Sequence, residues 1–114
     1  MNNNELDKEL LTGYLNDLTK DIVQKMIELY TQQSNIYLDD IGGSVVQESH
    51  ELWREHCHKM KGAAGSVGLK QVHAYLVSVE KSLDSFDQKA VTLSELTQLN
   101  KEGITAFNQW LNTV

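Results

Sequence analysis

The stretch CHKMKGAAGSVGL, residues 57–69, guides the interpretation of the whole chain. It continues an amphipathic helical pattern, yet it carries glycine at positions 62, 65 and 68. A glycine inside a helix costs roughly 1 kcal/mol relative to alanine. A helix that accepts this cost more than once is expected to gain something from the missing side chains.

Two faces emerge when this segment is drawn as a helix, because successive residues are rotated by about 100° around the axis. With Leu52 as the reference, the apolar face collects Val45, Val46, Ser49, Trp53, His56, Cys57, Met60, Ala63, Ala64 and Val67. His58 lies nearly opposite, at roughly 240°. The residues that share its side are Arg54, Lys61, Gly62 and Gly65.

His58 is the candidate reactive residue of this second face. Gly62 and Gly65 follow it by four and seven positions and so lie in the same column of the helix surface. Because helical side chains lean toward the N-terminus, a side chain at position 62 would cover the imidazole. Glycine there lets a partner approach closely. With the cation of Lys61 beside it, the exposed ring suits reversible acceptance of an anionic group such as phosphoryl.

These residues resemble a known family. HKMKGAAGSVGL, residues 58–69, is similar to the signature of histidine phosphotransfer (HPt) domains: His-x-hydrophobic-Lys-Gly, small residues, then hydrophobic-Gly. The sequence KGAAGSVGL is most similar to that of C-terminal phosphotransfer domains of hybrid sensor kinases of the anaerobic-respiration and trimethylamine-oxide-sensing type. The resemblance is specific over residues 57–80 and looser over about 6–111. Cys57 departs from it, since alanine is common there.

The resemblance implies a role in a phosphorelay. His58 would accept a phosphoryl group from the aspartyl-phosphate of a receiver domain and pass it to the aspartate of a response regulator. Nε2 of the neutral imidazole would attack, and Lys61, helped by Lys59 or Arg54, would offset charge on the phosphoryl oxygens. The receiver would bring Mg²⁺, and the chain would need no cofactor of its own.

Further site residues also follow from the resemblance. The family places Gln or Glu beside the phosphorylated imidazole, so Glu80 could accept a hydrogen bond from His58 Nδ1 and leave Nε2 free. The alternative is a solvated helix glutamate, and the sequence leaves both open. Gly62, Gly65 and Arg54 are the candidates for receiver docking.

The length and composition of the chain indicate one ordinary globular domain. The chain has 114 residues, 40% hydrophobic and 23% charged, without proline, which fits an all-helical fold. Its net charge of −6 argues against a nucleic-acid partner, because phosphate backbones require clustered Lys and Arg. The single cysteine excludes an internal disulfide and fits a reducing compartment.

We expect a single, monomeric HPt domain over residues 1–114, with Met1–Asn4 disordered. No apolar run approaches the ~20 residues of a membrane span, and no signal peptide opens the chain. The expected location is therefore cytoplasmic, without direct membrane contact, for a free protein or for the C-terminal domain of a membrane-anchored sensor kinase.

Hydrophobic periodicity predicts five helices, at about residues 5–15, 17–40, 45–67, 69–85 and 93–111. Short connections favour antiparallel neighbours. The expected fold is all-α: an up-down-up-down four-helix bundle with an additional short N-terminal helix.

The predicted helix limits depend on turn and capping signals. Gly42-Gly43 is the clearest break, followed by a capping box at Ser44-x-x-Gln47, and Gly68 is the expected C′ residue of the central helix. Residues 87–89 are expected to form a loop, followed by a second capping box at Thr92-x-x-Glu95.

Two predicted helices have well-defined apolar faces. On the first long helix the face comprises Leu18, Ile22, Met26, Leu29, Tyr30 and Ile36, interrupted by Gln33 as a polar layer or a kink. The helix after Gly68 has the 3-4 spacing of a left-handed bundle, with Leu69, Val72, Leu76, Val79, Leu83 and Phe86.

Other chemistry finds less support. His56 and His58 are two residues apart, so their side chains point about 200° apart on a helix and cannot share one metal ion. His56 falls on the apolar face and is expected to be a core or boundary residue. Nothing resembles an ATP site, so self-phosphorylation from ATP is not expected. The competing function is a helical binding module for a receiver or another partner, in which His58 performs no chemistry.

Overall fold

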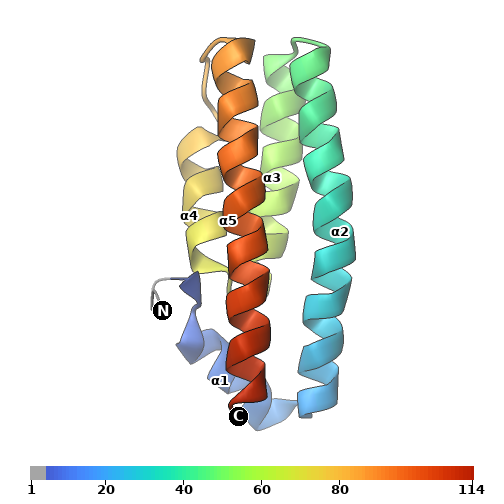
Figure 1. The fold of residues 1–114 in the computed structure, drawn as a ribbon, viewed down its shortest axis with the longest axis vertical. Helices are drawn as coiled ribbons and strands as arrows, with labels where there is room; N and C mark the ends of the chain where they lie inside the picture. The colour runs from blue at the N-terminus through green and yellow to red at the C-terminus, as the bar shows by residue number, and fades with distance from the viewer. Residues whose placement is uncertain (1–4) are drawn as a thin grey trace.

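A computed structural model describes residues 5–114 and is all-α, as predicted (Figure 1). The described part contains five helices: α1 (Lys8–Asp17), α2 (Lys20–Val46), α3 (His50–Ser66), α4 (Lys70–Val79) and α5 (Phe86–Asn112). The expectation of disorder for Met1–Asn4 lies outside the described residues.

The four helices α2 to α5 form the predicted up-down-up-down bundle (Figure 1). Helix α2 packs against α3 and α5, and α4 packs against the same two helices, which closes the ring. Helix α1 lies across one end, where buried Leu11 covers the core. Leu6 forms an isolated antiparallel bridge with Leu69 and joins the N-terminal segment to the α3–α4 turn.

The prediction of a break at Gly42-Gly43 is wrong, because α2 continues through both glycines to Val46. A Cβ at Gly42 would lie 3.5 Å from Leu93 Cδ2, so α5 packs closely against α2 there. Ser44 caps nothing; it is buried and its hydroxyl donates to the Ile41 carbonyl at 2.6 Å.

The true connection between α2 and α3 comes a few residues later. Glu48 adopts a positive φ of 53°, a left-handed conformation that reverses the chain. Ser49 is the N-cap of α3, and its Oγ accepts the Leu52 N–H at 3.1 Å. Val45 and Val46 therefore belong to α2. The buried face of α3 is centred on Trp53, Cys57, Met60 and Ala64.

Helix α4 is shorter than predicted, since it ends at Val79 and not near Ser85. Leu83, placed on the apolar face by its spacing, is 80% exposed in the connection to α5. Ser85 is the N-cap of α5 and accepts the Gln88 N–H at 3.1 Å. Residues 87–89 are thus helical, and Thr92 lies inside α5 instead of capping it. The 3-4 spacing could not show where α4 ends, because the apolar period continues through Leu83, whereas the N-cap Ser85 already begins the next helix.

The buried face of α2 also differs from the prediction. Ile22, Leu29 and Ile36 are 45%, 66% and 53% exposed. Tyr30 is buried as predicted, and it is joined in the core by Val23, Ile27, Ser34 and Ile41. Gln33 is exposed, and the polar layer is formed by its neighbour Ser34, whose Oγ accepts from Asn100 Nδ2 at 3.0 Å. Asn100 in turn accepts from the Tyr30 hydroxyl at 2.7 Å, which links α2 to α5 inside the bundle.

A pair of leucines tests where α4 ends. Leu76 is fully buried, so Leu76→Ala should lower the free energy of unfolding by about 2–5 kcal/mol. Leu83→Ala should change it by less than about 0.5 kcal/mol, because Leu83 is 80% exposed. Urea unfolding followed by circular dichroism measures both. A similar loss for the two variants would mean that Leu83 packs in the core.

Candidate functional site

The turn after α3 aligns α4 beside the face that carries His58. Gly68 has φ of 72°, and its N–H donates to the Gly65 carbonyl at 3.2 Å, while Leu69 N–H donates to Ala64 at 3.0 Å. This pair of bonds is a Schellman motif, which ends the helix with a left-handed residue. A Cβ at Gly68 would also lie 3.1 Å from Leu11, so glycine permits α1 to approach. The prediction of Gly68 as the C′ residue is confirmed.

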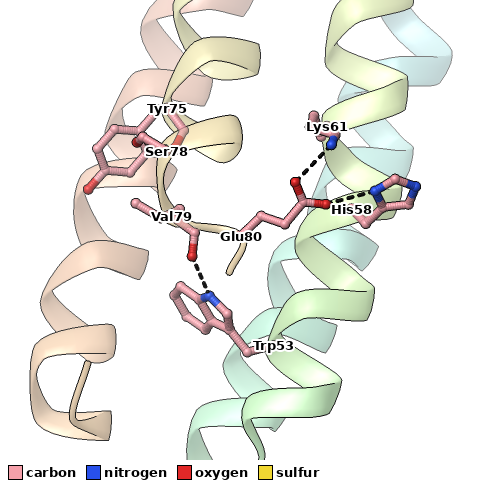
Figure 2. A network of polar contacts seen from close by, with 7 residues as sticks. All are labelled: Trp53, His58, Lys61, Tyr75, Ser78, Val79 and Glu80. Atoms are coloured by element: carbon pink, nitrogen blue, oxygen red, sulfur yellow. Dashed lines mark hydrogen bonds and ion pairs between the residues drawn. The ribbon is translucent and has the colours of Figure 1, made fainter. Parts of the chain in front are cut away.

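His58 lies on the solvent side of α3 and is joined to the end of α4. Its side chain is 70% exposed, and its Nδ1 lies 2.7 Å from Oε1 of Glu80. The second ring nitrogen points away from Glu80 (Figure 2). The hydrogen bond expected between these two residues is therefore present, although they are 22 positions apart in the sequence.

Glu80 is a buried carboxylate with two donors. Only 5% of the residue is exposed, so it is no solvated glutamate. Its Oε2 accepts from Lys61 Nζ at 2.8 Å, while Oε1 faces His58 (Figure 2). Lys61, 23% exposed, is thus directed at the carboxylate. Lys61, Glu80 and His58 form a continuous polar chain from the edge of the core to solvent.

The protonation state of Glu80 determines which ring nitrogen of His58 carries the hydrogen. Burial alone would raise the pKa of Glu80, but hydrogen bonds and charges from Lys61 and His58 outweigh it and lower the pKa below its ordinary value. The ionised carboxylate can only accept, so Nδ1 of His58 carries the hydrogen. In the neutral ring the free lone pair is then on Nε2.

Trp53 holds the chain immediately before Glu80. The indole, fully buried on α3, donates from Nε1 to the Val79 carbonyl at 2.9 Å (Figure 2). This carbonyl belongs to the last turn of α4, which leaves its acceptors without helical partners. The helical pattern placed Trp53 on the apolar face but could not predict this contact, because nothing in the local sequence shows where α4 ends.

The two glycines of the His58 column have different surroundings. A Cβ at Gly62 would meet nothing within 4 Å, so this position is open to a partner. A Cβ at Gly65 would lie 3.0 Å from His73 Cδ2 on α4. Gly65 therefore allows α4 to pack closely against α3, a reason within the fold that the helical wheel did not reveal.

The other candidate residues are more peripheral. Lys59 is half exposed and lies 3.6 Å from Glu55. Arg54 is exposed one turn before His58 and lines a small hollow of about 190 Å³ that also contacts Glu80. Half-buried His56 lies 4.0 Å from Asp40 across the α2–α3 boundary.

Cys57 is a core residue. The side chain is fully buried, and burial raises the pKa of its thiol to about 12, which keeps it protonated and unreactive at neutral pH.

Residues 5–114 contain no group of three or more His, Cys, Asp or Glu that could hold a metal ion. Over the same range, none of the helices combines the length and apolar character needed to cross a membrane.

An apolar groove near the C-terminal half of α3 was missed in the sequence. It has a volume of about 450 Å³ and is lined by Met26, Leu29, Tyr30, Gln33, Ala63, Ser66 and Val67. Leu29, assigned to the core by its spacing, is the most exposed of the three misplaced apolar residues of α2. The available signal was the number of apolar residues on α2, which exceeds what one buried face can hold.

Glu80 should make stability depend on acidic pH. Because its pKa in the folded state is lowered, the carboxylate stabilises the protein above about pH 4.5 and loses this effect as the pH falls through the folded-state pKa. As the pH falls below about 4.5, the free energy of unfolding should therefore fall more steeply in the wild type than in Glu80→Gln. Asp39→Asn, at an exposed position on α2, controls for the loss of one surface charge. Parallel curves for the wild type and Glu80→Gln would contradict the ionised, paired carboxylate.

Comparison with known proteins agrees with this geometry. The family model for the Hpt domain matches residues 25–110, which include the whole of α3 and α4. No curated protein and no solved structure matches the chain. The match covers most of the sequence and contains the segment around His58. The chain therefore belongs to the Hpt domain family, whose role is histidine phosphotransfer in phosphorelays.

Proposed function

We propose that His58 is the phosphoryl acceptor of this Hpt domain and that Nε2 is the attacking atom. The observation that carries the proposal is the 2.7 Å contact between His58 Nδ1 and buried Glu80. It fixes the ring orientation and the tautomer, and it directs the lone pair of Nε2 toward solvent. A second protein can reach this atom because the side chain is 70% exposed.

The transfer needs no proton movement in this arrangement. The Nε2 lone pair forms the bond to phosphorus, the bond to the donor aspartate oxygen breaks, and that oxygen leaves as a carboxylate. The ring then bears a positive charge, which the Glu80 carboxylate 2.7 Å away stabilises. Lys61 keeps Glu80 ionised and weakly basic, so the hydrogen remains on Nδ1. The reverse sequence passes the group to another aspartate.

The partners we propose are receiver domains, one of a hybrid sensor kinase and one of a response regulator. A receiver would supply Mg²⁺ together with its acidic pocket. Docking would extend from His58 over Gly62 toward exposed Leu29, with Arg54 and Lys59 near the phosphoryl oxygens. Transfer in both directions requires weak binding, so the expected interface buries roughly 1,200 Å² or less in total.

The hybrid-kinase assignment rests on the KGAAGSVGL wording of residues 61–69. We propose that residues 1–114 act as one monomeric phosphotransfer domain in the cytoplasm, within or beside a sensor kinase of the anaerobic-respiration or trimethylamine-oxide-sensing type. The alternative, a binding module without chemistry, gives no reason for the Glu80 contact that orients His58.

Replacement of His58 tests the acceptor. His58→Gln should abolish labelling by a phosphorylated receiver and retain the helical circular dichroism spectrum, because the side chain is exposed. His56→Gln, two residues away and half-buried, is the control and should still accept phosphate at lower thermal stability. Labelling is measured as acid-labile phosphate on the chain. Undiminished labelling of His58→Gln would refute the assignment.

Gly62 separates docking from chemistry. Gly62→Gln should fold, because a Cβ there meets nothing within 4 Å, and its side chain should lean over His58. Reaction with phosphoramidate, a small donor, should persist. Transfer from a phosphorylated receiver should fall about ten-fold or more, which requires only about 1.4 kcal/mol of obstruction. Equal loss with both donors would mean that Gly62 serves the chemistry or the fold, and no loss with either would remove its docking role.

A further inference from the structure

Lys89, on the first turns of α5, is a buried cation outside the site described so far. Only 1% of it is exposed, and none of the ion pairs within residues 5–114 includes it. Its ammonium instead lies 3.0 Å from His50 Nδ1 and donates to the carbonyls of Ser82 at 2.7 Å and Asp84 at 3.2 Å. These contacts account for all three N–H groups of the side chain.

Aromatic rings complete the surroundings of this ammonium. Nζ lies 5.2 Å from the ring centroid of Trp53 and 5.4 Å from that of Phe86, within the range of cation–π attraction. His50 stacks on Phe86 with a centroid separation of 4.6 Å. Lys89 therefore links α3, the α4–α5 connection and the start of α5 in one cluster.

Burying a lysine in this space costs more free energy than burying an apolar side chain. Removing the ammonium from water lowers the pKa of Lys89, and the nearby charge of Asp84 opposes this effect only in part. Apolar residues of similar volume often replace buried charges without loss of stability. A methionine would fill the same volume but could not bind backbone carbonyls. What an apolar residue could not replace is thus the hydrogen bonding of Lys89 to the carbonyls of the connecting segment.

That segment begins with Glu80. The carbonyl before Glu80, that of Val79, is held by Trp53 at 2.9 Å, and the carbonyl two residues after it, that of Ser82, is held by Lys89 at 2.7 Å. Glu80 therefore lies between two backbone groups that are fixed from the core. Its carboxylate must stay within hydrogen-bond distance of His58 to orient the ring, so movement of this segment would weaken that contact.

We propose that Lys89 is a positioning residue for phosphoryl transfer: its buried ammonium fixes residues 80–84 and thereby holds Glu80 against His58. The proposal rests on the assignment of His58 as acceptor, and it adds a residue that never touches the reacting atoms. Trp53 acts from the other side of Glu80 in the same way.

The test uses Lys89→Met, which keeps the length of the side chain and removes its donors. Nitrogen-15 NMR of labelled histidine, at one fixed pH, should show a smaller fraction of His58 with the hydrogen on Nδ1. Transfer from a phosphorylated receiver should fall about ten-fold, an effect of the size found for residues coupled through contacts. In a Glu80→Gln background, Lys89→Met should cause no further decrease, because the carboxylate that it positions is already absent.

Two controls separate positioning from general loosening of the bundle. Lys101→Met removes an exposed cation from the same helix and should leave the tautomer and the transfer rate unchanged. Leu96→Ala removes a fully buried side chain of α5 and should lower stability without altering the tautomer. If Lys89→Met does not fold, Lys89→Gln, which retains a donor for one carbonyl, takes its place with the same two measurements.

An unchanged tautomer in the Lys89 variant would overturn the proposal. So would an equal loss of transfer in the wild-type and Glu80→Gln backgrounds, which would show that Lys89 acts independently of Glu80. The NMR measurement requires no phosphorylation. If the wild type accepted no phosphate, the acceptor assignment would therefore fail while the tautomer still decided the role of Lys89.

Discussion

The shared carboxylate of Glu80 is the interaction on which the site depends. A buried carboxylate is stable only when donors replace the water it has lost, and here Lys61 and His58 provide them from α3 at 2.8 and 2.7 Å. The result is an imidazole with two different nitrogens. Nδ1 is bound to a group at the edge of the core, while Nε2 faces solvent. An exposed histidine on a surface helix would otherwise rotate among several rotamers.

The bundle supplies this carboxylate by controlling both ends of α4. At its start, the left-handed Gly68 turns the chain so that α4 returns along α3. At its end, the Trp53 indole donates a hydrogen bond to the Val79 carbonyl, and Lys89 donates to the Ser82 carbonyl in the connection that follows. Glu80 directly follows α4 (Lys70–Val79) and keeps helical backbone angles, with its N–H donating to the Leu76 carbonyl at 2.9 Å. Its carboxylate therefore leaves the last turn of α4 and reaches His58 and Lys61 on α3.

Glycine serves several physical purposes in this chain. At Gly68 the backbone needs a positive φ, and at Gly65 the missing side chain admits His73 of the neighbouring helix. At Gly62 nothing within the protein occupies the space, which is consistent with the approach of another molecule. The spacing of glycines alone therefore did not distinguish internal packing from an open surface.

The sequence by itself determined the all-α bundle, the solvent-facing position of His58 and the left-handed turn at Gly68. These features follow from local rules: the 3.6-residue period, the absence of proline, and the need for glycine where φ is positive. The resemblance in the motif also pointed to Glu80 as a neighbour of His58. Each of these depends on residues that are close together in the chain or on a recognisable pattern.

Only the tertiary structure decided where α2 and α4 end, which face of α2 is buried, and that Lys61 and Lys89 hold the segment around Glu80. Gly42 and Gly43 lie inside a helix because packing of α2 against α3 and α5 outweighs their poor helix propensity. Leu83 and Leu29 are exposed although their spacing fits a buried face. Leu83 lies in the connection before the N-cap Ser85, and Leu29 lies outside the face of α2 that packs in the core. Contacts such as Lys61–Glu80, 19 positions apart, and Lys89–His50, 39 positions apart, have no local signature, since they form only when the helices are packed side by side.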